Sequence, residues 1–181
     1  MRELWSHPSL PHLRRNENVA VATGGCWSDV STLHKTLLTR VDMYEHDHGD
    51  AMSASALAQL LSTTLYGRRF FPYYAFNVVA GLDANGDGVV YTYDAVGSYE
   101  QVNYAAQGAG QKLIIPLLDN LVGHRTRLDS PPDLTAEEAV KVIKEAFITA
   151  GERDIYTGDS VEIITIASAG KQSEVFKLKE D

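Results

Sequence analysis

Residues 66–99 read YGRRFFPYYAFNVVAGLDANGDGVVYTYDAVGSY, and this stretch decides the fold. Apolar residues alternate on both sides of its central Asn85-Gly86 pair, which is the period of a β-strand. An Asn-Gly pair supplies the positive φ angles that a tight hairpin turn requires, so the stretch predicts a central antiparallel strand pair. The alternating positions are Tyr74, Phe76, Val78 and Ala80 before the turn and Val90, Tyr91 and Tyr93 after it.

The same turn carries a calcium-like pattern. Residues 83–88, DANGDG, match the opening of an EF-hand loop, and Asp94 stands at its twelfth position. An EF-hand loop lies between helices, whereas this one lies between strand-patterned segments, and Asp94 is shorter than the glutamate that gives bidentate ligation. We therefore prefer a hairpin turn and keep a calcium-binding module from Asp83 to Asp94 as an alternative.

The composition is that of one ordinary domain. The chain has 181 residues, of which 44% are hydrophobic, and this suffices for a core without disulfides or metals. Its formal net charge of −8 disfavours a large nucleic-acid or anionic-membrane surface. The single cysteine, Cys26, excludes an internal disulfide and suits a reducing compartment. With neither a secretory signal nor an apolar run of about 20 residues, we expect a cytoplasmic and nuclear protein.

Periodicity along the rest of the chain predicts an α+β domain. Residues 1–18 lack a helical or strand period, so we expect an irregular lead followed by a domain at residues 19–181. Helices in pairs between groups of strands predict sheets covered by helical layers rather than an alternating βαβ chain. The expected elements are a strand at residues 19–22, a helix from Ser28 or Asp29 to about His46, a helix from Ser53 or Ser55 to Leu65, the hairpin, a strand at residues 99–106, a helix from Gly110 to Leu121, a helix from the capping box at Thr135 to Gly151, and strands at residues 160–167 and 173–178.

Three segments carry a family resemblance: residues 61–100, residues 116–123 (PLLDNLVG) and residues 150–163 (AGERDIYTGDSVEI). With them, the chain resembles the β-type subunits of the 20S proteasome, and among these a non-catalytic member of the β ring. The resemblance implies the N-terminal-nucleophile hydrolase fold, a four-layer αββα sandwich, with the first strand hairpin of full-length members missing. It also implies other proteasome α and β subunits as partners in a hetero-oligomeric ring stack, and no cofactor, metal, nucleic acid or membrane.

The resemblance further implies which chemistry to expect. Active members use an N-terminal threonine, freed after a glycine, whose own amine serves as the base. Since this chain contains no Gly-Thr pair, we expect a non-catalytic structural component that takes part in assembling the complex that degrades intracellular proteins. The positions that match the family are Asp154, Thr157, Gly158, Gly25 and Asp29, and without a nucleophile we expect them to be structural.

Two other patterns have both a chemical and a structural interpretation. Residues 24–29 lie at a strand-to-helix turn, so that Cys26 or Ser28 could be the nucleophile of an independent hydrolase, although the Gly-x-Ser-x-Gly spacing is absent. His46, Asp47, His48 and Asp50 offer ligands for zinc or nickel, but a solvated loop between two helices is the preferred interpretation.

Two basic segments are ambiguous in the same way. Residues 108–112, GAGQK, could hold an anion at a helix start, yet the P-loop spacing is absent and a helix entry turn is preferred. Residues 68–74, RRFFPYY, mix cations with aromatic rings and could stack nucleobases. Because the whole chain is acidic, a packing or subunit-contact surface is the preferred interpretation.

Overall fold

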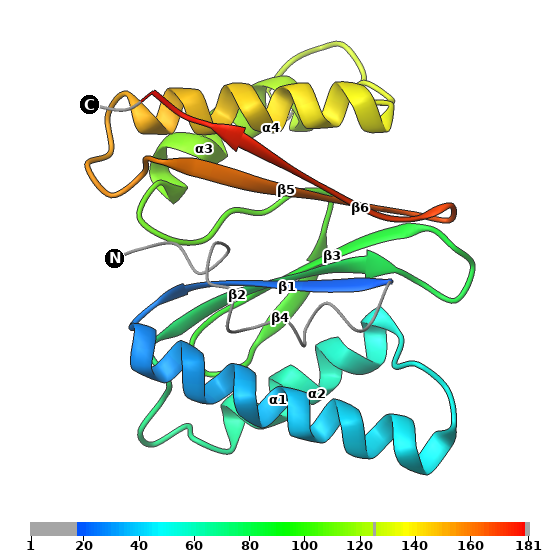
Figure 1. Cartoon of the computed structure of the whole chain (residues 1–181). Coiled ribbons are helices and arrows are strands. Elements are labelled where there is room, and N and C mark those ends of the chain that lie inside the picture. Colours follow the sequence, from blue (N-terminus) through cyan, green and yellow to red (C-terminus); the bar gives the residue numbers. More distant parts are fainter. Residues whose placement is uncertain (1–17, 125, 180–181) are drawn as a thin grey trace.

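The computed structural model describes residues 18–124 and 126–179. Their elements stack in four layers, which Figure 1 shows from bottom to top as α1 with α2, a four-stranded sheet, a two-stranded sheet, and α3 with α4. This is the αββα sandwich that the sequence predicts; the expected lead lies outside the described residues except for Asn18. In chain order the elements are β1 (Val19–Gly25), α1 (Trp27–His48), α2 (Ala54–Tyr66), β2 (Ala75–Leu82), β3 (Gly88–Tyr93), β4 (Tyr99–Val102), α3 (Gln111–Leu118), the π-helical turn η2 (Asp119–Gly123), α4 (Ala136–Gly151), β5 (Ser160–Ala167) and β6 (Gly170–Lys177).

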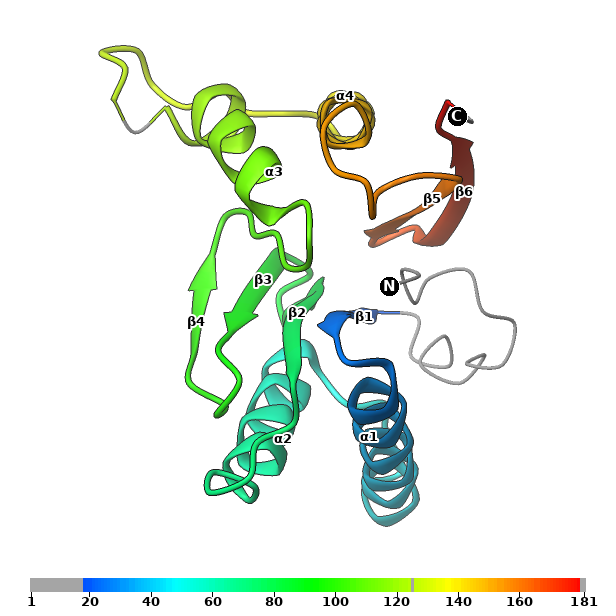
Figure 2. The same ribbon diagram turned by 90° about the vertical axis from the view of Figure 1, so that its left-hand side faces the viewer.

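Both sheets are antiparallel. The larger has the order β1-β2-β3-β4, and the smaller pairs β5 with β6. Figure 2 shows α1 and α2 on one side of the larger sheet and α3, α4 and the smaller sheet on the other. The predicted central pair is confirmed, with Ala80 opposite Val90 and Leu82 opposite Gly88.

The turn of this hairpin differs from the two-residue turn that the sequence predicts. The Asp83 N–H donates to the Asp87 carbonyl (2.9 Å) and the Gly86 N–H to the Asp83 carbonyl (3.1 Å), so three residues form the loop. Only Gly86, with a φ of 86°, has a positive φ, and Asn85 does not. The prediction was wrong because a turn followed by one left-handed glycine matches the strand twist as well as an Asn-Gly pair does.

The alternating apolar residues of β2 do not lie on its more buried face. The buried positions are Ala75, Asn77, Val79 and Gly81, and they face α1 and α2 in the main hydrophobic core. The alternating set at Phe76, Val78 and Ala80 is half-buried and faces the second pair of layers. A strand covered on both faces loses the alternation that marks a strand with one wet face, so alternation could not identify the buried side.

The helix boundaries follow local signals. Cys26, rather than Ser28 or Asp29, is the N-cap of α1, which ends at Gly49 in the left-handed conformation with its N–H bonded to the Glu45 carbonyl. Ser53 caps α2 by accepting from the Ala56 N–H (3.3 Å). Thr135 caps α4 in the predicted capping box, which is confirmed.

The fourth strand and the third helix deviate most from expectation. β4 ends at Val102 rather than near residue 106, because the chain then leaves the sheet and Tyr104 and Ala106 pack against α3 and α4. α3 is also short, since Pro116 lies inside it and η2 continues the chain to Gly123. In the described part of the chain, the helices are all too short or too polar to span a bilayer.

Candidate functional site

A cavity of about 210 Å³ lies between the end of β1 and the α3–α4 layer. It is a place in the described fold where a small group could be enclosed. Its wall is apolar and unusually rich in glycine and alanine, with polar groups from few residues. The lining residues are Ala22, Thr23, Gly24, Gly25, Val78, Ala105, Ala106, Gln107, Gly108, Ala109, Gly110, Ile114, Leu118, Ile143, Ala146, Phe147, Tyr156 and Thr157.

Close backbone packing at one side of this cavity requires glycine. Gly25 has a φ of 133°, and a Cβ there would stand 2.3 Å from the Tyr74 carbonyl oxygen. A Cβ on Gly24 would stand 2.9 Å from the Gly108 Cα. Asp29, in the first turn of α1, accepts the Tyr74 N–H at 2.9 Å, and the Cys26 N–H donates to the Tyr74 carbonyl at 2.8 Å. Gly25 and Asp29 therefore join the β1–α1 turn to the start of β2.

The turn from residue 154 to residue 157 forms the opposite rim. The Thr157 hydroxyl donates to the Asp154 carboxylate at 2.6 Å, and the same carboxylate accepts the Tyr156 N–H at 3.2 Å. Thr157 is buried, and its Oγ1 would lie 3.3 Å from a Cβ on Gly110 at the start of α3. Asp154 thus closes an Asx-type turn against α3. Gly158 has open space around it and no positive φ, so nothing in the described structure requires glycine there.

A buried polar chain behind the cavity was not anticipated from the sequence. His34 on α1 contacts Thr23 on β1 (Nε2 to Oγ1, 2.7 Å), and the Thr23 hydroxyl donates to Asn77 Oδ1 at 2.8 Å. The Thr23 hydroxyl has one hydrogen, which it donates to Asn77 Oδ1. The contact with His34 must therefore be a hydrogen bond from the His34 Nε2–H to the Thr23 oxygen. His34 is 4% exposed, and burial lowers its pKa to about 4. The sequence contains one signal for the burial of His34, which is its place in the apolar stripe of α1 between Leu33 and Leu37.

The His34–Thr23 contact is not a nucleophile and its base. A general base must accept a hydrogen bond from the hydroxyl that it deprotonates. Here His34 is the donor to Thr23, and the Thr23 hydroxyl donates its hydrogen bond to the amide oxygen of Asn77. His34 Nδ1 has no hydrogen-bond partner among the described residues. The hydrogen bonds among His34, Thr23 and Asn77 therefore link α1, β1 and β2.

Cys26 is exposed at the start of α1. Its Sγ lies 3.3 Å from the Ser28 hydroxyl, and this hydrogen bond, with backbone N–H groups of Asp29 and Ser28, lowers the pKa of the Cys26 thiol. Among the described residues, no histidine or lysine forms a hydrogen bond with the Cys26 thiol. The predicted rival nucleophile thus has a lowered pKa but no described base.

The calcium pattern does not form a site. Asp83 Oδ1 accepts the N–H groups of Asn85 (2.8 Å) and Asp87 (2.9 Å), which also lowers the pKa of its carboxyl. Asp94 Oδ1 accepts the N–H groups of Val96 and Ser98 in the next turn. The six residues of β3 separate the two carboxylates by roughly 20 Å, since a strand rises about 3.3 Å per residue. The EF-hand alternative is therefore wrong.

The histidine cluster also lies elsewhere than expected. His46, Asp47 and His48 belong to the last turn of α1, not to a loop, and the His48 ring stacks on Tyr44 with centroids 4.0 Å apart. His48 Nδ1 contacts the Tyr44 carbonyl at 2.8 Å. Across residues 18–124 and 126–179, no group of three or more histidine, cysteine or acidic side chains is placed to bind a metal.

The predicted helix entry turn at residues 108–112 is confirmed. The Gln111 N–H donates to the Gly108 carbonyl, and the Leu113 and Ile114 N–H groups donate to Gly110. The Asp154 carboxylate lies close to Gly110, so negative charge already occupies the start of α3. This arrangement does not favour the binding of an anion at the start of α3.

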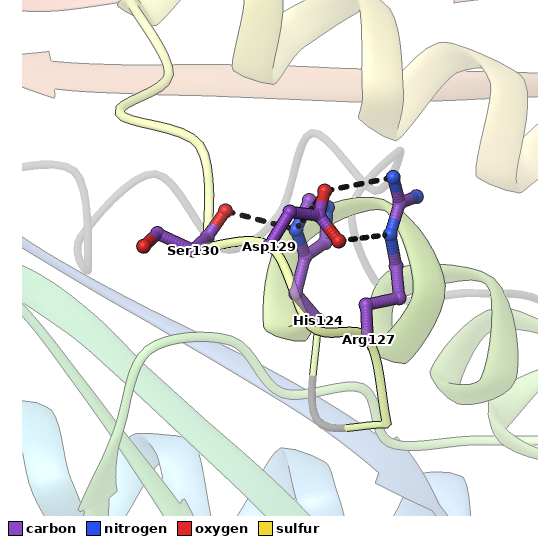
Figure 3. A network of polar contacts seen from close by, with 4 residues as sticks. All are labelled: His124, Arg127, Asp129 and Ser130. Atoms are coloured by element: carbon purple, nitrogen blue, oxygen red, sulfur yellow. Dashed lines mark hydrogen bonds and ion pairs between the residues drawn. The ribbon is translucent and has the colours of Figure 1, made fainter.

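A polar network in the loop between η2 and α4 has a local role. Arg127 donates two hydrogen bonds of 2.8 Å to the Asp129 carboxylate (Figure 3). These bonds lower the pKa of the Asp129 carboxyl and raise the pKa of the Arg127 guanidinium. His124 Nδ1 donates to the Ser130 carbonyl at 3.0 Å and lies 3.3 Å from Asp129. Each partner lies within this one loop, so the network holds the loop in shape.

Comparison with known proteins agrees with this fold. Residues 12–166 match the family described as "Proteasome subunit". "Proteasome subunit beta type-1" of Oryza sativa subsp. japonica is 49% identical over 170 residues, covering 91% of this chain and 77% of that protein. The Arabidopsis thaliana protein of the same name is 48% identical, covering 91% and 76%, and that of Danio rerio is 41% identical, covering 98% and 76%.

The family match extends over the four-stranded sheet, both helical layers and most of β5, including the cavity and its rim. The residues that resemble the β-type subunits in the sequence lie in the hairpin, in α3 with η2, and in the turn that holds Asp154 and Thr157. The chain therefore belongs to the proteasome subunit family, and its similarity is to the subunits named beta type-1.

Proposed function

We propose that this chain is a non-catalytic β subunit of the 20S proteasome, which contributes structure to the β ring rather than peptide-bond cleavage. It would act by assembling with other proteasome α and β subunits, in the complex that degrades intracellular proteins. The observation that carries the non-catalytic part is the cavity wall. Among the described residues this wall contains no serine, cysteine or lysine, and both of its threonines, Thr23 and Thr157, lie inside the chain, where they have no free α-amine to serve as a base.

A hydrolase of this family needs a nucleophile whose proton can pass to a nearby base. The base in active members is the free α-amine of an N-terminal threonine, which the internal Thr157 lacks. Its partner Asp154 also accepts the Tyr156 N–H, so this pair supports a turn. Cys26 lies outside the cavity wall. The family positions Asp154, Thr157, Gly25 and Asp29 therefore act by holding backbone segments together.

The test separates cleavage from assembly. The purified chain is exposed to fluorogenic peptides and to a threonine-directed epoxyketone probe, and we expect neither hydrolysis nor a covalent adduct. In parallel, the tagged chain is expressed in eukaryotic cells, and we expect it to co-sediment with 20S particles purified through another subunit. A covalent adduct, or hydrolysis that is lost in Cys26→Ser, would contradict the proposal.

We further propose that the protein resides in the cytoplasm and the nucleus. The one cysteine of the chain is an exposed free thiol, which suits a reducing compartment. Fluorescence microscopy of a tagged chain, with compartment markers, tests this; accumulation in the secretory pathway would contradict it.

A further inference from the structure

The connection between α2 and β2 exposes four aromatic and two arginine side chains, which we call the aromatic–arginine patch: Tyr66, Arg68, Arg69, Phe70, Phe71 and Tyr74. Phe70 is 94% exposed and Phe71 83% exposed. Side chains of this kind are the usual anchors of protein interfaces, while isolated soluble chains keep most of their apolar area covered.

The patch is held in one conformation. Hydrogen bonds of about 3 Å from the N–H groups of Arg68, Arg69 and Phe71 to carbonyls three residues earlier form successive tight turns. The segment is anchored by the buried Tyr73 ring and then by Tyr74, which bonds Asp29 and Cys26 through its backbone. A surface that is already ordered loses little conformational entropy when a partner binds it.

Both guanidinium groups lie over aromatic rings. Arg68 Cζ lies 4.8 Å from the centroid of the Tyr73 ring, and Arg69 Cζ lies 5.3 Å from that of Phe70. In the described chain, neither arginine forms an ion pair with a carboxylate. Stacked guanidinium groups keep their edge N–H groups available for a bidentate carboxylate from outside.

Local charge sets this surface apart from the rest of the molecule. The chain carries a formal charge of −8, yet no aspartate or glutamate occurs in residues 51–82, which contain the patch. The carboxylate described next to it is that of Asp29, which accepts the Tyr74 N–H. A positive, aromatic patch on an acidic protein is complementary to an acidic partner surface and disfavours positively charged partners.

We propose that the aromatic–arginine patch is a docking site for a neighbouring proteasome subunit whose surface offers an apolar recess, filled by Phe70 and Phe71, flanked by carboxylates that pair with Arg68 and Arg69. The inference rests on the proposed function, because it names the kind of subunit surface that this chain meets. A second copy of this chain and a single-stranded nucleic acid are the competing occupants.

The first experiment measures incorporation of the tagged chain into 20S particles in eukaryotic cells. We expect Phe70→Ser/Phe71→Ser and Arg68→Glu/Arg69→Glu each to lower the incorporated fraction about tenfold or more, as expected for interface anchors. Matched controls are Leu128→Ser/Ile155→Ser, which removes two exposed apolar side chains, and Lys141→Glu/Lys179→Glu, which makes the same charge change elsewhere. Both controls should assemble like the unmodified chain.

The outcomes separate the two proposals. If the unmodified chain fails to enter 20S particles, the proposed function is overturned and the docking site with it. If the unmodified chain enters and the patch variants enter equally well, the docking site alone is overturned.

A second experiment does not depend on how the variants fold. The photoreactive residue p-benzoylphenylalanine is placed at Phe70, the assembled particles are irradiated, and the cross-linked peptide is sequenced by mass spectrometry. We expect one adduct, on a different proteasome subunit, in a peptide that contains aspartate or glutamate. An adduct on a second copy of this chain or on nucleic acid, or no adduct within assembled particles, would overturn the docking site.

Discussion

His34 shows how one buried residue makes the stability of this protein depend on pH. Its imidazole has a pKa of about 4 in the folded chain, because burial disfavours the charged form, against about 6.5 in an unfolded chain. Between these values the unfolded chain binds a proton that the folded chain does not, so stability rises with pH. The contribution is fully present above pH 6.5 and is lost as pH falls toward 4.

We expect the free energy of unfolding to fall by on the order of 3 kcal/mol from this residue between pH 6.5 and 4. Urea unfolding at several pH values measures it, with His34→Gln as the comparison, since glutamine can still donate to Thr23 but does not titrate. Parallel pH profiles for the two proteins would show that His34 is not the source.

Gly25 and Gly49 both have a positive φ, but only one of them is crowded. At Gly25 a Cβ would collide with the Tyr74 carbonyl oxygen, whereas at Gly49 nothing lies within 4 Å. We expect Gly49→Ala to cost about 1 kcal/mol through backbone strain alone, and Gly25→Ala roughly 3 kcal/mol or more, because β2 must also shift. Thermal or chemical denaturation measures both, and equal losses would contradict the steric argument.

At the scale of the elements, α4 depends on its N-terminal cap. Thr135 Oγ1 accepts the Glu138 N–H at 3.3 Å, and the Glu138 carboxylate accepts the Thr135 N–H at 2.9 Å. We expect Thr135→Ala to lower the free energy of unfolding by about 1 kcal/mol. Thr149→Ala is the matched control, since Thr149 is exposed inside the same helix, where alanine is the better helix former. A loss in the control as large as that in Thr135→Ala would rule out the cap as the cause.

The same elements show what could be predicted from local sequence. The capping box and the strand at residues 160–167 were predicted correctly, and Ser53 was one of the two predicted starts of α2, because each depends on residues close together in the chain. The end of β4 and the Cys26 cap were not, because packing against distant segments decides them. At the candidate site, Gly25 and Asp29 were selected by family resemblance, but their shared contact with Tyr74 joins segments about 45 residues apart.

At the scale of the whole molecule, each sheet has an unpaired edge within the described chain. β1 pairs only with β2, and β5 only with β6. Exposed strand edges offer free N–H and carbonyl groups to other chains, so we expect the isolated protein to self-associate as its concentration rises. Sedimentation velocity over a wide concentration range measures this.

We expect Ile164→Lys on β5 to reduce self-association, because a charge on an edge strand opposes pairing. Thr149→Lys on α4 adds the same charge away from the edge and should leave self-association unchanged. A chain that remains monomeric at every concentration would contradict the edge argument.

The amino-acid sequence by itself determined the order of the elements, most helix starts and the family. These depend on period, caps and short motifs, which are properties of neighbouring residues. Only the tertiary structure decided that His34, Thr23 and Asn77 form one buried chain, that Asp83 and Asp94 cannot share a metal, and that Phe70 and Phe71 remain uncovered. Side chains far apart in sequence meet or separate only once the layers pack, and burial, which decides their chemistry, exists only in the packed molecule.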